Sequence, residues 1–115
     1  MNSGIRNVRL SDAFYDDLYR YLGPERGPAG EPSSLDFETY ELPWILHRFA
    51  VSWESLPERY VNNPRYRVLV TTGSLVYSYA VTGELVPDGS VTLLQLRMEL
   101  YPPELSEDEP DETRP

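Results

Sequence analysis

The sequence contains no cysteine, no lysine and a single histidine. Without cysteine the chain has no disulfide framework and no thiolate ligands for zinc, which agrees with a reducing compartment. His47 has no second imidazole with which to form a relay or a metal pair, so we interpret it as structural or exposed. Glycine-rich phosphate loops and nucleophile-elbow motifs are also absent. We therefore expect neither a metal nor a cofactor.

Long apolar runs are missing as well. A membrane-spanning helix needs roughly 18 to 20 apolar residues, and no stretch of this chain approaches that length. The amino terminus lacks the basic-then-apolar layout of a signal peptide. We therefore expect a soluble, cytoplasmic protein with no membrane partner. With 40% hydrophobic and 12% aromatic residues in 115, the chain has enough apolar material to fold as one domain.

The formal charge of −9 is distributed unevenly along the chain. Residues 102–115 contain six acidic residues and one arginine, and so carry −5 of that charge. This segment is rich in Pro, Glu and Asp, so we predict an acidic, disordered tail. Its simplest role is to solubilise the protein, and the alternatives are self-inhibition over basic residues or binding of a basic partner. Because the whole chain is acidic, we expect no direct non-specific binding to DNA.

The first 22 residues predict a strand followed by a helix. Apolar and polar residues alternate over 5–10, which is typical of a short strand. Ser11 then occupies an N-cap position, and apolar residues recur at helical spacing from Phe14 to Leu22. The Gly23-Pro24 pair ends that pattern.

A loop and a second helical segment follow. Residues 23–34 hold three glycines, three prolines and two serines, a composition that prevents regular structure. Residues 36–56 carry an apolar stripe at helical spacing. Proline is tolerated only in the first turn of a helix, so either the main helix begins near Pro43 or a longer helix kinks there.

Residues 66–101 predict three consecutive strands. The expected ranges are 66–72, 75–82 and 90–100, rich in β-branched and aromatic residues. Short turns at 72–74 and 87–89 join them, so we expect an antiparallel meander. The predicted class is therefore α+β, with the order β-α-α-β-β-β. The helices should pack on one face of a mainly antiparallel four-stranded sheet formed within residues 1–101.

Alternation along a strand assigns side chains to faces. In the last strand we expect one row to face the helices and the other to face away, namely Leu94, Leu96, Met98 and Leu100 inward, and Gln95, Arg97 and Glu99 outward. In the strand over 66–72, Tyr66, Val68 and Val70 can form a core-facing row. That assignment puts Arg67 on the open face beside Arg97.

The element order and several short motifs resemble the RelE/ParE superfamily of toxins from bacterial toxin-antitoxin systems. The motifs are VRLSDAFYDDLYRYL for the first strand and helix, Tyr66-Arg67-Val68 at the start of the second strand, LVYSYAV in the third, and VTLLQLR in the fourth. The resemblance covers most of residues 5–101. It implies a small antitoxin-like partner whose extended or helical segment covers the sheet and helices.

The ribonuclease branch of that superfamily implies metal-independent cleavage of mRNA on the ribosome, through attack of a ribose 2′-hydroxyl on the adjacent phosphate. Arg67 matches the family's phosphate-binding arginine in the second strand. Arg97 lies near its basic cluster at the end of the last strand, and Tyr101 stands for its carboxy-terminal tyrosine. The resemblance also leaves open the gyrase-poisoning branch of the superfamily, in which the target is gyrase.

The chain departs from the family pattern in three respects. The family's second arginine aligns near Leu75 or Val76, its lysines are missing, and its basic surface has become acidic. Two alternatives to a ribonuclease therefore stay open: a non-catalytic protein-interaction domain on the same fold, and an acidic mimic of nucleic acid. On either alternative, Arg67 and Arg97 are solvated strand residues or ion-pair partners of Glu84 and Glu99.

Overall fold

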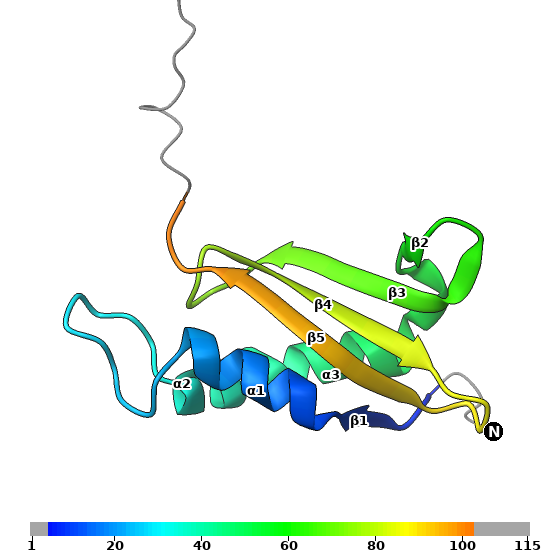
Figure 1. Ribbon diagram of the computed structural model, residues 1–115, viewed down its shortest axis with the longest axis horizontal. Helices are drawn as coiled ribbons and strands as arrows, with labels where there is room; N and C mark the ends of the chain where they lie inside the picture. Colours follow the sequence, from blue (N-terminus) through cyan, green and yellow to red (C-terminus); the bar gives the residue numbers. More distant parts are fainter. Residues whose placement is uncertain (1–4, 103–115) are drawn as a thin grey trace, which may run out of the picture.

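Residues 5–102, which the computed structural model describes, form a helical layer packed against a twisted sheet (Figure 1). The elements are β1 (Val8–Leu10), α1 (Asp12–Tyr21), α2 (Ser34–Tyr40), α3 (Leu42–Val51), a 3-10 turn (Trp53–Ser55), β2 (Glu58–Tyr60), β3 (Asn63–Thr72), β4 (Ser78–Leu85) and β5 (Val91–Glu99). The predicted α+β class is confirmed. Apart from its first residue, the predicted acidic tail lies outside the described residues.

The sheet has five strands in the order β1-β5-β4-β3-β2. Strands β3, β4 and β5 form the predicted antiparallel meander, β2 adds antiparallel to β3, and β1 runs parallel to β5. The prediction of four strands was wrong by one. Strand β2 has three residues, all exposed, and so lacks the alternation that would reveal it. Among the described residues, no helix is long and apolar enough to cross a membrane.

Helix α1 begins where the sequence predicts. The hydroxyl of Ser11 accepts a hydrogen bond from the Phe14 amide at 3.1 Å, which is the N-cap arrangement, and Asp12 adds negative charge to the first turn. Phe14 and Leu18 are fully buried in the core. The helix ends before Leu22, whose amide still donates to the Leu18 carbonyl.

The helical segment predicted over 36–56 is divided into α2, α3 and the 3-10 turn. A capping box between Ser33 and Asp36 starts α2 at Ser34, which is the last residue of the predicted loop. Pro43 lies in the first turn of α3, so the alternative in which a helix begins near this proline is correct. The division places Glu41 at the junction of α2 and α3.

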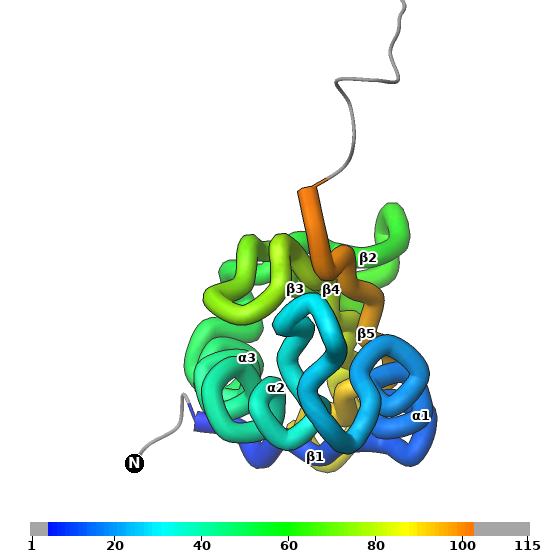
Figure 2. The backbone as a smooth tube through the Cα atoms, turned by 90° about the vertical axis from the view of Figure 1, so that its left-hand side faces the viewer, coloured from blue at the N-terminus to red at the C-terminus, as the bar shows by residue number. Residues whose placement is uncertain are grey.

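The edge of the sheet beside β5 is closed in two ways. Its first half pairs with β1, and the Ser11 amide donates to the Leu93 carbonyl at 3.1 Å. Its second half lies alongside α1, where a carboxylate oxygen of Asp17 accepts a hydrogen bond from the Leu96 amide at 2.9 Å. Figure 2 shows α1 at the β5 side of the layer and α3 at the opposite side. The carboxylate of Asp17 thus satisfies a backbone amide at the edge of β5 that has no neighbouring strand to bind.

A β-bulge divides β5 and corrects the predicted inward row. Thr82 is opposite Gln95, but Gly83 is opposite Leu93, so Leu94 is an extra residue. Leu93 and Leu96 are therefore both buried, whereas Leu94 is only half-buried. The inward assignment of Leu94 was wrong, and that of Leu96 was right.

The faces of β3 are the reverse of the prediction. Leu69 is 3% exposed and belongs to the core, whereas Val70 is 67% exposed. Tyr66 and Val68 share the parity of Val70 and are only half-buried. The expectation of a core-facing row at these three positions was wrong, because apolar residues occupy both faces of this strand and alternation alone cannot distinguish them.

The helical layer meets the sheet through a large core, made of Phe14, Leu18, Leu22, Phe37, Leu42, Ile45, Phe49, Trp53, Leu56, Leu69, Val76, Tyr79, Val81, Val91, Leu93, Leu96 and Met98. At Gly83 on β4, a Cβ atom would lie 2.7 Å from the ring of Phe49. Glycine at this position lets α3 pack directly on β4.

The buried carboxylate of Glu41 connects the helices to the β3–β4 loop. It accepts hydrogen bonds from the Ser74 amide at 2.6 Å, the Leu75 amide at 2.9 Å, the Ser74 hydroxyl at 3.0 Å and the Tyr79 phenol at 3.1 Å. A Cβ atom on Gly73 would lie 2.9 Å from the same carboxylate. The loop therefore encloses the carboxylate, and four donors compensate for its burial.

Replacing Glu41 by alanine should reduce the free energy of unfolding by about 3 kcal/mol or more, because buried amide donors in the loop lose their acceptor. Glu41→Gln should have a smaller effect, since it keeps one acceptor oxygen. Chemical denaturation followed by circular dichroism measures both, with the exposed Glu58→Ala as control. Equal stabilities of the Glu41→Ala and Glu58→Ala variants would contradict the structural role of Glu41.

Tyr79 should make the protein sensitive to high pH. Burial, together with the charge and hydrogen bond of Glu41, raises the pKa of Tyr79 far above its ordinary value of 10.0. The folded state thus holds this proton more tightly than the unfolded state, and the resulting stabilisation is lost as the pH rises above about 10. Unfolding measurements from pH 8 upward should show a shallower decline in Tyr79→Phe than in wild type. The exposed Tyr77→Phe variant should decline as wild type does.

Candidate functional site

Arg67 lies on the helix-facing side of β3 and is occupied by backbone carbonyls. Its Nη1 donates to the carbonyl of Leu56 at 2.8 Å and of Glu54 at 3.2 Å, and its Nε donates to the carbonyl of Pro64 at 3.3 Å. The guanidinium also stacks 5.6 Å from the ring centroid of Trp53. Arg67 thus holds the chain that leads from the 3-10 turn into β3, which is a structural task.

Arg97 lies on the other face of the sheet. It is opposite Ala80 on β4, which in turn is opposite Val70 on β3, so these three side chains form a row across the open face. Arg97 is exposed, as predicted. Arg67 belongs to the alternate row, so the prediction that Arg67 and Arg97 share the open face was wrong. The cause is the reversed parity of β3.

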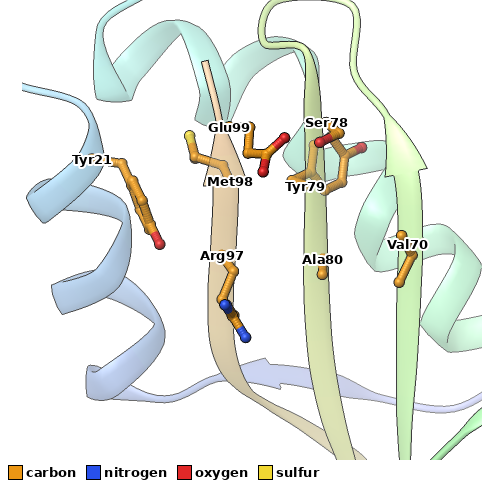
Figure 3. Close-up of a pocket in the computed structure, with 8 residues that line it drawn as sticks. All are labelled: Tyr21, Val70, Ser78, Tyr79, Ala80, Arg97, Met98 and Glu99. Atoms are coloured by element: carbon orange, nitrogen blue, oxygen red, sulfur yellow. The ribbon is translucent and has the colours of Figure 1, made fainter. Parts of the chain in front are cut away.

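The open face is hollowed above β4. A cavity of about 290 Å³ is lined by Tyr21, Val70, Ser78, Tyr79, Ala80, Arg97, Met98 and Glu99. Figure 3 shows the lining residues of β4 between Val70 of β3 and Arg97 of β5, with Tyr21 reaching in from the end of α1. Ser78 and Ala80 are small, so the larger side chains on either side form the walls.

The hollow offers one unpaired positive group. Within residues 5–102, Arg97 forms no ion pair, although the Glu99 carboxylate lies on the same face two residues further on. Tyr21 and Ser78 supply hydroxyl groups, and Val70 supplies apolar surface. A guanidinium with nearby hydroxyls can bind a carboxylate or a phosphate. The lining contains no histidine and no second cation.

Tyr101, the third predicted site residue, lies elsewhere. Its phenol donates a hydrogen bond to the carboxylate of Glu31, in the loop between α1 and α2, and this bond is the main cause of the raised pKa of Tyr101. Tyr101 does not line the hollow. Of the three residues predicted to act together, the structure brings only Arg97 to the candidate site.

The remaining arginine–carboxylate contact expected on the sheet involves a different arginine. Glu84 pairs with Arg65 at 2.5 Å, and not with Arg67. Arg65 also stacks over Tyr66, whose ring meets Tyr60 edge to face at 5.6 Å. These residues gather where β2 joins β3. Because Glu84 is occupied there, it does not neutralise Arg97.

Other predictions concern single residues. Tyr79 is buried in the core, and His47 is exposed on α3. No cluster among the described residues could hold a metal ion. Sequence reasoning missed Tyr21 and Ser78 as lining residues. The available signals were weak: Tyr21 falls at the end of an amphipathic helix, and Ser78 and Ala80 alternate as small residues along β4.

Comparison of the chain with known proteins gives no match to a family model, to a curated protein or to a solved structure. The likeness to the RelE/ParE superfamily therefore rests on the short motifs and on the order of the elements.

The two arginines should differ in their effect on stability. Arg67→Ala leaves three carbonyls without their donor and removes the stacking on Trp53, so it should reduce the free energy of unfolding by about 2 kcal/mol. Arg97→Ala removes an exposed, unpaired side chain and should stay within about 0.5 kcal/mol of wild type. Urea denaturation of the two variants provides the comparison. An Arg67→Ala protein with the same free energy of unfolding as wild type would show that the carbonyl contacts do not stabilise the fold.

Proposed function

We propose that the chain is a non-catalytic protein-interaction domain with a RelE/ParE-like order of elements, acting in the cytoplasm. Its partner binds the open face of the sheet at the hollow around Arg97. The observation that carries this proposal is the division of the two arginines: Arg67 is bound to three backbone carbonyls, and Arg97 is exposed with no ion pair among the described residues.

Binding is favoured over catalysis by the composition of the hollow. Cleavage of a phosphodiester without metal requires positive groups around the phosphate, together with a proton donor and acceptor. Arg97 is the single cation in the lining. Leu75 lies near the position of the family's second arginine, and its amide is bound to Glu41. The site is therefore short of the charge that such a reaction needs.

The hollow suits a partner side chain that ends in a carboxylate. Arg97 can donate two parallel hydrogen bonds to such a group, and Tyr21 and Ser78 can donate from the sides. Val70 and Ala80 offer apolar contact for the stem of the same side chain. A glutamate on an extended or helical segment of a small antitoxin-like protein fits these requirements.

A toxin that cleaves mRNA on the ribosome is the second candidate. It is favoured by the strand-helix-strand order together with Arg97 beside the phenol of Tyr21 and the carboxylate of Glu99. In that case Arg97 binds the scissile phosphate, and no metal takes part. Gyrase is the corresponding target if the chain belongs with the gyrase-poisoning branch.

Expression in a bacterial host distinguishes the two candidates. For an interaction domain, induction of the full chain leaves growth unchanged and a stoichiometric partner copurifies from the native host. Arg97→Glu should lose that partner, because the variant places a negative charge against the partner's carboxylate. Arg59→Glu, which makes the same change at an exposed position of β2, should retain it.

Growth arrest that is relieved by Arg97→Ala would instead support the toxin. Normal growth with no copurifying partner would contradict both candidates. Retention of the partner by Arg97→Glu would move the binding surface away from the hollow.

A further inference from the structure

The outer edge of β3 is uncovered over its last residues. Strand β2 pairs with β3 only between Asn63 and Arg67, and the Val68 amide donates to the carbonyl of Pro57 at 3.0 Å. The Gly73 amide points the other way, toward the carbonyl of Tyr77 in the hairpin. Because the direction alternates along an antiparallel strand, the amides and carbonyls of residues 70 and 72 point outward. They have no backbone partner among the described residues.

This edge also lacks the usual protection against pairing. Exposed edges in monomers commonly carry charges, prolines or bulges. Residues 68–73, with the sequence VLVTTG, include no charge and no proline, and Val70 is 67% exposed. The opposite edge of the sheet is covered by β1 and by Asp17 of α1. The edge beside β5 is thus covered, whereas the edge of β3 exposes uncharged residues and backbone groups that another strand could pair with.

We propose that a second copy of the chain pairs with this edge, antiparallel and around a two-fold axis at Thr71. In this register Val70 is opposite Thr72 of the second copy, and Thr72 is opposite its Val70. Each of these two pairs exchanges two backbone hydrogen bonds, so four new bonds form. It is the one antiparallel register in which both outward-facing residues of each copy are paired with each other.

The surroundings of the edge fit a second copy. The uncovered part of β3 lies between its pairing with β2, which ends at Arg67, and the end of the strand at Thr72. In the antiparallel dimer, the β3–β4 turn of one copy therefore lies next to β2 of the other, and the strand ends before it would collide with β2. Although the chain is acidic overall, the residues that meet at the axis are neutral, and the two copies do not repel there. The dimer uses the backbone edge of the sheet, whereas the proposed function uses the open face, and Val70 belongs to both because it also lines the hollow.

Sedimentation velocity of the full chain over a wide range of concentration tests the dimer. Wild type should show a reversible monomer–dimer equilibrium. Val70→Lys places a charge at the pairing surface and should raise the dissociation constant by about tenfold or more. Val61→Lys adds the same charge at a site that is 89% exposed in the β2–β3 turn, and should leave the equilibrium unchanged. A monomer at all concentrations, or a dimer that persists in Val70→Lys, would overturn the proposal.

A single introduced cysteine tests the register. The chain has no cysteine of its own, so Thr71→Cys can form a disulfide only between two molecules. Residues that face each other in a non-hydrogen-bonded antiparallel pair lie about 4.5 Å apart at Cα, which a disulfide can span. Mild oxidation should crosslink Thr71→Cys rapidly and the exposed Val61→Cys slowly. Equal rates would exclude the two-fold at Thr71, and a crosslink only to an added extended peptide would assign the edge to a different protein.

Discussion

The carboxylate of Glu41 is the interaction on which the arrangement of the sheet depends. It lies where α2 ends and α3 begins, and it accepts hydrogen bonds from the loop that joins β3 to β4. A buried carboxylate is costly unless donors surround it, and four donors do so here. Three of these donors come from Ser74 and Leu75 in the loop, and the fourth is the phenol of Tyr79 on β4. Glu41 thus holds the β3–β4 loop and Tyr79 in the positions that the observed register of β3 and β4 requires.

That register determines which side chains each face of the sheet presents. Leu69 and Val81 face the helices, whereas Val70, Ala80 and Arg97 lie in a row on the open face. A slip of one residue would exchange the two sets. Because Leu94 is an extra residue in β5, Leu93 before it and Leu96 after it both face the core.

The division of faces changes the chemistry that the chain can perform. Two arginines on one surface could have bound and polarised a phosphate together. Instead, Arg67 binds backbone carbonyls between the 3-10 turn and β3. Among the described residues, Arg97 is the one cation that lines the hollow. A single guanidinium between small and apolar residues favours recognition over catalysis. The acidic composition points the same way, since it disfavours contact with nucleic acid.

Local signals in the sequence predicted much of the fold. The N-cap at Ser11, the first-turn proline of α3 and the turn at Pro87-Asp88-Gly89 each depend on short-range chemistry, and each is found in the structure. Gly89 adopts a positive φ of 92°, as its place in that turn requires.

Features that depend on distant contacts were not predictable in this way. The parity of β3 is hidden because valine and leucine occupy both faces, and the bulge at Leu94 has no signature of its own. The placement of Arg97 on the open face was predicted from alternation close to it. That of Arg67 was not, because the parity of β3 is reversed, and its partners, the carbonyls of residues 54 and 56, approach it only in the folded state.

The different roles of Arg67 and Arg97 are tested most directly by the hydrogen exchange of their side chains. Nitrogen-15 NMR resolves the Nε–H groups of individual arginines, with assignment by Arg→Lys substitution. The Nε–H of Arg67, bound to the Pro64 carbonyl, should exchange with solvent much more slowly than that of exposed Arg97. Equal rates, or slower exchange at Arg97, would contradict the assignment of Arg67 to structure and Arg97 to binding.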